Sequence, residues 1–167
     1  MSLIILSKSS GKENIMCLLK DKKVRNNHHK ENGYCVAYKI INENNRAPFM
    51  RDFKYKVGEN PANPAYKVGE IPVFQAHPSR DGLRDFAFYG LHLMLSLEET
   101  KDFVVSHFSD EFTLFNAKII KVYYKPEDVI AYGYAIDAAF YNAKKNGRSV
   151  VVKSCLVKSL EPLEPII

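Results

Sequence analysis

The stretch GLHLMLSLEETKDFVVSHF (Gly90–Phe108) decides the fold, because a short apolar run gives way within it to a helical pattern. Ser96 is followed three residues later by Glu99, which is the capping-box spacing at the start of a helix. We therefore expect Gly90–Leu95 to be a strand that leads directly into a helix over 96–108. The residues expected on one face of this helix are Leu97, Thr100, Val104 and Phe108.

A second helix is predicted over 135–146. Within AIDAAFYNAKKNG, apolar side chains recur at helical spacing, at Ile136, Ala139, Phe140 and Ala143. Two lysines would occupy the last turn of this helix, where positive charge is favourable. Gly147 follows them and is a natural left-handed stop for the helix.

Three runs have the composition of strands. The run YCVAYKII (Tyr34–Ile41) is rich in β-branched and aromatic residues and is followed by the turn sequence NENN. The other two runs are FTLFNAKIIKVYY (Phe112–Tyr124) and RSVVVKSCLVKSL (Arg148–Leu160). This order of elements predicts an α+β fold, with a mainly antiparallel sheet and two principal helices, at about 96–108 and 135–146.

A chain of 167 residues is long enough to bury one core and is most simply a single domain. We assign residues 1–33 to an N-terminal extension and 34–160 to the α+β domain. Residues 161–167 form a C-terminal tail that is either a surface strap or disordered. The first apolar run, Leu3–Leu6, is far shorter than a membrane span, so we expect no membrane partner.

The pentapeptide YKVGE occurs twice, at Tyr55–Glu59 and at Tyr66–Glu70, with NPANPA between the copies. Solenoid repeats need at least three copies of about twenty residues or more, so two short copies indicate a turn-forming phrase. Gly58 and Gly69 are free to take a positive φ. The two copies either pair with each other as a hairpin, or one of them is an inserted duplicate that loops out.

The formal net charge is +5 at neutral pH, which permits binding to a polyanion without requiring it. The most basic stretch, Lys20–Lys30, fits a solvated loop better than a nucleic-acid patch. The cysteines Cys17, Cys35 and Cys155 are widely spaced, which indicates free thiols in a reducing compartment. Their spacing to the histidines matches no usual zinc site, so we expect no metal.

From Tyr34 onward the chain resembles a small bacteriophage module that occurs at the C-terminus of rIIB-type phage proteins and in related uncharacterised domains. The segments that carry the resemblance are AYKII (Ala37–Ile41), YKVGE, GLHLMLSLEET (Gly90–Thr100), KVYYKPEDVIAYG (Lys121–Gly133) and NGRSVVVKSCLV (Asn146–Val157). The chain departs from the family pattern in its second YKVGE and in the helix predicted at 135–146.

This resemblance implies a phage or viral accessory protein that has no enzymatic activity and acts in the host cytoplasm. Its partner would be a host protein or a nucleotide-like small ligand. The resemblance implies no cofactor for such a protein, and it names no particular ligand or host factor.

A second resemblance is to mono-ADP-ribosyltransferase-like folds. These folds carry a His or Tyr beside a basic residue on a first strand, followed by a segment of the form G-x-(H/Y)-x-x-x-S that enters a helix. The parts of this chain that fit are the adjacent residues Tyr38 and Lys39 and the segment GLHLMLS (Gly90–Ser96). The residues alone also allow a plainer interpretation, in which the tyrosine and lysine are ordinary sheet residues and the histidine is a hydrogen-bonded core residue.

The second resemblance implies an enzyme that acts on an NAD-type substrate. In its site Tyr38 and His92 would clamp the nicotinamide ribose, while Glu127 or Glu161 would orient a ribose hydroxyl as positive charge develops at the anomeric carbon. Two further positions are candidates for ligand binding, and they are Lys39 and Ser96.

The segment HPSRDGLRDF (His77–Phe86) gathers charged side chains in a turn-rich stretch. It is either a solvated loop laced with opposite charges or a loop that binds an anion or nucleotide. In the second case His77, Arg80 and Arg84 are the candidate ligand-binding residues, because guanidinium groups match phosphate oxygens. A third functional class, weak nucleic-acid binding, rests only on the basic net charge.

Overall fold

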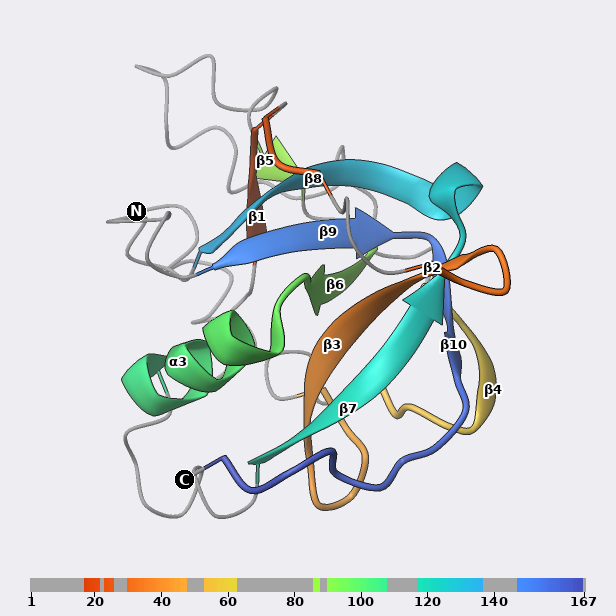
Figure 1. Cartoon of the computed structure of the whole chain (residues 1–167), viewed down its shortest axis with the longest axis vertical. Coiled ribbons are helices and arrows are strands. Elements are labelled where there is room, and N and C mark those ends of the chain that lie inside the picture. The colour runs from red at the N-terminus through yellow and green to blue at the C-terminus, as the bar shows by residue number, and fades with distance from the viewer. Residues whose placement is uncertain are drawn as a thin grey trace.

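The computed structural model describes residues 17–21, 23–25, 30–47, 53–62, 86–87, 90–107, 117–136 and 147–166. Within these ranges ten strands form one antiparallel sheet, and one α-helix packs on it (Figure 1). The strands are β1 (Cys17–Lys20), β2 (Lys30–Glu31), β3 (Tyr34–Asn42), β4 (Gly58–Pro61), β5 (Phe86–Ala87), β6 (Leu91–Met94), β7 (Ala117–Tyr124), β8 (Val129–Ile136), β9 (Arg148–Val152) and β10 (Ser154–Val157). The helix is α3 (Leu97–His107), and a single 3-10 turn, η3 (Pro126–Asp128), joins β7 to β8.

The sheet has the order β4-β10-β7-β3-β6-β9-β8-β1-β5, and β2 pairs with β3 outside this path. The prediction of an α+β domain with a mainly antiparallel sheet is therefore confirmed. The longest ladder joins β3 to β7, from Cys35 opposite Tyr124 to Asn42 opposite Ala117. The run predicted as a strand at Tyr34–Ile41 is β3, which extends one residue further.

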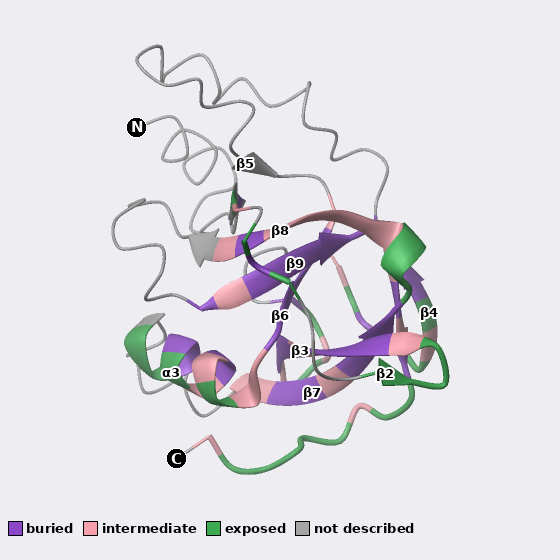
Figure 2. Cartoon of the chain, turned by 45° about the horizontal axis from the view of Figure 1, so that its top comes forward, coloured by how far each residue is buried: buried purple, intermediate pink, exposed green. Residues whose placement is uncertain are grey.

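Alternation along β3 sends its side chains to two different cores. Ala37 and Ile41 face the main core, where Val122 of β7 also lies. Ile40 faces the opposite side of the sheet and packs there with Phe103 of α3. In Figure 2 the buried residues of α3 lie on its sheet side, whereas the opposite side is exposed.

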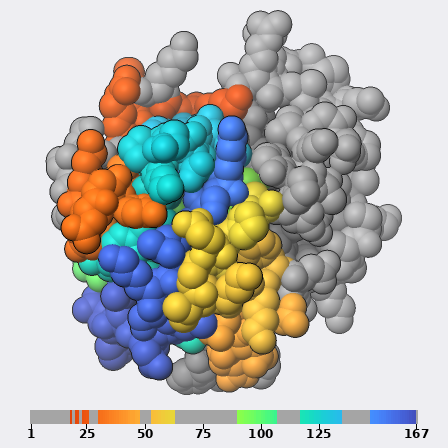
Figure 3. Space-filling model, turned by 90° about the vertical axis from the view of Figure 1, so that its right-hand side faces the viewer, coloured from red at the N-terminus to blue at the C-terminus, as the bar shows by residue number. Residues whose placement is uncertain are grey.

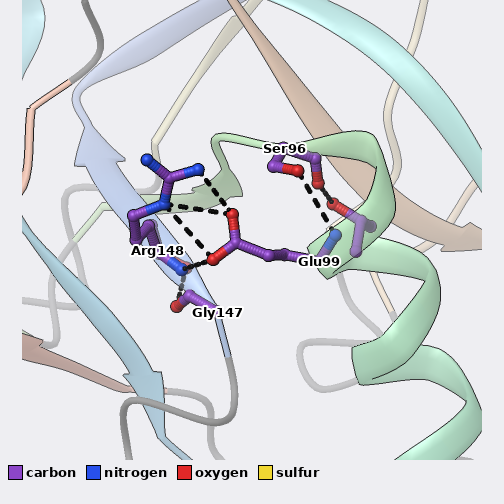
Figure 4. Close-up of polar contacts among 6 residues, drawn as sticks. Ser96, Glu99, Gly147 and Arg148 are labelled. Atoms are coloured by element: carbon purple, nitrogen blue, oxygen red, sulfur yellow. Dashed lines mark hydrogen bonds and ion pairs between the residues drawn. The ribbon is translucent and has the colours of Figure 1, made fainter.

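The strand over the GLH sequence leads into α3 as predicted. Ser96 precedes the helix, and its Oγ accepts a hydrogen bond from the N–H of Glu99 at 3.3 Å (Figure 4). Thr100 Oγ1 donates a hydrogen bond to the carbonyl oxygen of Ser96 at 2.6 Å. The Glu99 carboxylate reaches across to β9, where it accepts hydrogen bonds from the backbone N–H and the guanidinium of Arg148. This contact ties the start of α3 to the strand beside β6.

The buried side of α3 agrees in part with the predicted face. Thr100 and Val104 are fully buried, as expected. Phe103 is buried as well, although the predicted face omitted it, while Leu97 is only partly buried. Phe108 lies outside the described residues. The side of the helix that packs on the sheet is therefore centred slightly differently from the predicted face, since it includes Phe103.

The second predicted helix does not begin at residue 135. Ala135 and Ile136 are the last residues of β8 and pair with Leu18 and Cys17 of β1. Cross-strand pairing with a segment far away in the sequence outweighs the local helical spacing of the apolar residues. Residues 137–146 lie outside the described part of the chain, so α3 is the one α-helix among the described residues.

The first YKVGE copy is a structural element. Tyr55 is buried in the main core, and Gly58 has a φ of 109°, the positive value expected of it. The strand β4 starts at this glycine and pairs with β10. The Asn60 side chain closes the turn by donating to the carbonyl oxygens of Lys56 and Gly58. The second copy lies outside the described residues, so the choice between a hairpin of the two copies and an inserted duplicate stays open.

Both ends of the described chain pack on the sheet. In the region assigned to the N-terminal extension, β1 pairs with β8, and Leu18 is fully buried. In the tail, the N–H of Leu163 donates to the carbonyl oxygen of Ile119 on β7 at 3.0 Å, and Glu164 forms an ion pair with Lys101 of α3. The described part of the tail is therefore a surface strap.

Candidate functional site

The two residues expected to hold a nicotinamide ribose lie on one face of neighbouring strands. Tyr38 of β3 pairs with Met94 of β6, and His92 lies two residues before Met94 on the same face of β6. Met94 packs with Phe103 of α3, so this is the helix-covered face of the sheet. The structure thus brings Tyr38 and His92 to one region.

His92 is nevertheless nearly buried, with 8% of its surface exposed. Its Nδ1 lies 3.3 Å from the carbonyl oxygen of Gly90, a hydrogen-bond contact that orients the ring. This environment matches the plainer interpretation, a hydrogen-bonded core histidine. A ring so little exposed offers a poor surface for stacking a nicotinamide.

Lys39 points away from Tyr38, into the main core. Its Nζ donates a hydrogen bond to the carbonyl oxygen of His92 at 2.9 Å and lies 5.7 Å from the ring centroid of Tyr55. Burial lowers the pKa of the Lys39 ammonium to about 8. Burial likewise raises the pKa of the nearby Cys155 thiol to about 12. Lys39 is therefore an internal structural residue and does not face a ligand from solvent.

The other predicted site residues are dispersed or lie outside the description. Glu127 is exposed on η3, and β9 lies between β6, which carries His92, and β8, which follows η3. Glu161 is exposed in the tail, and Ser96 is the cap of α3. The remaining candidates lie outside the described residues, and they are His77, Arg80 and Arg84.

A different cluster on the surface has stronger chemical character. The rings of Tyr34 and Tyr123 meet edge to face with centroids 6.5 Å apart. Three lysine ammonium groups surround these rings. The Nζ of Lys158 lies 4.3 Å and that of Lys121 5.6 Å from the Tyr123 centroid, and the Nζ of Lys125 lies 5.8 Å from the Tyr34 centroid. We call these five residues the lysine–tyrosine face.

Strand alternation and a tight hairpin build this face. Ile119, Lys121 and Tyr123 lie on the same side of β7. Ile119 is packed in the core beneath α3, whereas Lys121 and Tyr123, further along the strand, are not part of that core. The β2–β3 hairpin places Tyr34 beside β7, and its turn consists of Asn32 and Gly33, with φ of 52° and 83°. Asn-Gly with both φ values positive is the favoured two-residue hairpin turn.

In Figure 3 the orange atoms of this hairpin lie on the same side of the molecule as cyan and dark-blue atoms from the middle and the end of the chain. Lys125 and Lys158 are exposed there, whereas Tyr34 and Lys121 are partly exposed and Tyr123 is 8% exposed. The face therefore consists of accessible ammonium groups above a nearly buried tyrosine.

One carboxylate balances part of the positive charge. Glu31 forms an ion pair with Lys121 at 3.1 Å. The hydrogen bond from Lys121 lowers the pKa of the Glu31 carboxyl, and the same bond raises the pKa of the Lys121 ammonium. Both groups are consequently charged at neutral pH. The three lysines of the face and Glu31 together therefore carry a net positive charge.

Sequence reasoning missed this face. Alternating lysine and tyrosine in KVYYK (Lys121–Lys125), together with the Asn32–Gly33 turn signal, could have pointed to most of it. Lys158 could not have been assigned to it, because this residue follows β10, and only the pairing of β10 with β7 in the folded chain brings it to Tyr123.

No family model, curated protein or solved structure matches the chain. The resemblances to the phage module and to ADP-ribosyltransferase-like folds therefore stay predictions. Within the described residues no group of three or more His, Cys, Asp or Glu side chains is arranged to hold a metal ion. The described part of the chain also contains no helix with the length and apolar character that crossing a membrane requires.

Proposed function

We propose that this protein is a non-enzymatic accessory protein that binds a nucleotide-like ligand through phosphate groups at the lysine–tyrosine face. One observation carries the proposal: Lys121, Lys125 and Lys158 bring three ammonium groups together over the Tyr34–Tyr123 pair. A phage setting and a location in the host cytoplasm are part of the same proposal and derive from the sequence resemblance.

The chemistry of the face suits phosphate. Each ammonium carries three donors and a full charge, and hydrogen bonds from charged donors to phosphate are among the stronger ones in proteins. Contacts with the tyrosine rings also restrict the lysine side chains before a ligand arrives. Less conformational entropy is then lost on binding, which favours affinity.

The positions of the candidate catalytic residues favour binding over catalysis. His92 and Lys39 are each 8% exposed, and Lys39 holds the backbone of His92 through its ammonium group. Groups that are occupied inside the sheet in this way are poorly placed to hold an NAD-type substrate. The enzymatic alternative remains testable, since it requires NAD consumption that is abolished in His92→Ala.

The proposal is tested by isothermal titration calorimetry with AMP, ADP, ATP, ADP-ribose and NAD. We compare the wild-type chain with a triple variant, Lys121→Gln/Lys125→Gln/Lys158→Gln. The matched control is Lys20→Gln/Lys23→Gln/Lys54→Gln, which removes the same charge from three exposed lysines outside the lysine–tyrosine face. We expect wild type and control to bind at least one phosphorylated nucleotide, more tightly as phosphates are added, and the triple variant to lose that binding. Equal binding by both triple variants would refute the proposed site.

A further inference from the structure

The lysines of the proposed site form a row. Lys121 lies on β7, and Lys125, directly after the strand, continues in extended conformation with φ −91° and ψ 143°. Four residues of extended chain separate their Cα atoms by about 13 Å. Lys158 lies over Tyr123, at the middle of this row. Positive charge therefore recurs along the direction of the strand and is not concentrated at one point.

A row of this kind matches a ligand whose negative charges also recur along a line. A mononucleotide carries its phosphates at one end and can meet only part of the row. A single strand of nucleic acid has a phosphate at every nucleotide, so successive phosphates can follow successive lysines. Proteins that bind single strands combine such a basic track with aromatic rings on which bases stack.

The tyrosines have different roles in such a complex. Tyr123 is 8% exposed and supports Lys121 and Lys158 from below. Tyr34 is partly exposed at the start of β3, so its ring can receive a base.

We infer that the ligand of the lysine–tyrosine face is single-stranded nucleic acid, bound by its phosphates along Lys121, Lys158 and Lys125 with a base on Tyr34. This inference rests on the proposed function and specifies its ligand class. It also assigns a role to Glu31, whose carboxylate lies 3.1 Å from Lys121 and repels an approaching phosphate.

The test is fluorescence anisotropy with a fluorescein-labelled twelve-nucleotide oligothymidylate, measured between about 50 and 200 mM salt. We expect wild type and the triple control to bind, with a slope of log K against log salt of about −2, since each neutralised phosphate of a single strand contributes about −0.7. The triple lysine variant should bind at least about tenfold more weakly with a shallower slope.

Two single variants report on the geometry. Tyr34→Leu should weaken binding by about fivefold or more, while Tyr34→Phe, which keeps the ring, should bind as wild type does. Glu31→Gln should tighten binding, because it removes the carboxylate that is paired with Lys121 of the row. A purely structural role for these residues would not produce an increase in affinity.

The outcomes separate this inference from the proposed function. If ATP binds at the lysines and the oligonucleotide binds no more tightly than ATP, the inference is wrong and the proposed function stands. Tighter binding of the corresponding twelve-base-pair duplex would also overturn it. If neither ATP nor the oligonucleotide binds, both proposals fail.

Discussion

Lys39 Nζ lies 2.9 Å from the carbonyl oxygen of His92, and this hydrogen bond joins β3 to β6 from inside the main core. The ladder between these two strands contains one residue pair, Tyr38 with Met94. The lysine side chain therefore reinforces the junction between the β3–β7 and β6–β9 parts of the sheet. This role explains why a charged residue occupies an interior position.

The buried ammonium should give the protein a specific pH dependence. The pKa of Lys39 is lowered from 10.5 to about 8 by burial, so between these values the unfolded chain holds a proton that the folded chain has released. Stability that depends on Lys39 should thus rise with pH across this window. Between pH 7 and pH 10.5, the free energy of unfolding of the wild-type chain should increase by about 3 kcal/mol relative to that of Lys39→Met.

Urea unfolding of both proteins across this pH range checks the prediction. Comparing the two chains removes most of the opposing contribution of Cys155, whose raised pKa lowers stability above about pH 9. Lys20→Met, at an exposed lysine, is the control and should show no such trend. If the difference in free energy of unfolding between wild type and Lys39→Met did not change with pH, the lowered pKa of Lys39 would be contradicted.

The Glu99–Arg148 contact should stabilise the start of α3 at neutral pH. Burial alone would raise the pKa of Glu99, but the hydrogen bonds from Arg148 outweigh it, and the pKa is lowered. This contribution is present above the ordinary glutamate pKa and is lost as pH falls below about 4.5. Glu99→Gln should therefore be destabilised at pH 7 and lose less stability than wild type on acidification.

A double-mutant cycle with Arg148→Met measures the pair directly. Because both side chains are partly exposed, we expect a coupling free energy of about 1 kcal/mol. Lys121 with Glu31, which is similarly exposed but is joined by a single hydrogen bond at 3.1 Å, serves as the comparison and should couple more weakly. A coupling free energy near zero would mean that the Glu99–Arg148 contact does not stabilise the folded protein.

Gly90 should tolerate no side chain. Its φ is 122°, and a Cβ there would lie 2.5 Å from Val151 Cγ1 and 2.9 Å from the carbonyl oxygen of Val152. Gly90→Ala therefore adds a steric clash to backbone strain and should cost about 3 kcal/mol or more. Gly33→Ala is the matched control, because Gly33 has a φ of 83° but open space around it, and should cost about 1 kcal/mol. Thermal unfolding of the two variants distinguishes strain from clash, and equal losses would be inconsistent with the packing at Gly90.

The sequence predicts this fold best where the determining signals are local. The start of α3 follows from Ser96 and Glu99, three residues apart, and the hydroxyl of Ser96 makes the expected bond. The helix predicted from 135 fails at its start because Ala135 pairs with Leu18, a contact that no local pattern reveals. Long-range pairing of this kind decides secondary structure against propensity.

The candidate site shows the same division. The Asn32–Gly33 turn is a local signal and could have indicated the hairpin that carries Tyr34. The position of Lys158 over Tyr123 depends on how β10 lies beside β7, which the sequence does not state. The sequence also did not indicate that the Lys39 side chain points into the core, since a lysine on a strand usually faces solvent.

The central claim is that ligand binds at the lysine–tyrosine face, and an NMR titration of the isotope-labelled chain tests it most directly. On addition of the unlabelled oligothymidylate, we predict that amide shift changes concentrate at residues 30–34, 121–125 and 158 and disappear in the triple lysine variant. Changes centred on Tyr38 and His92, or spread evenly over the described sheet, would contradict the account.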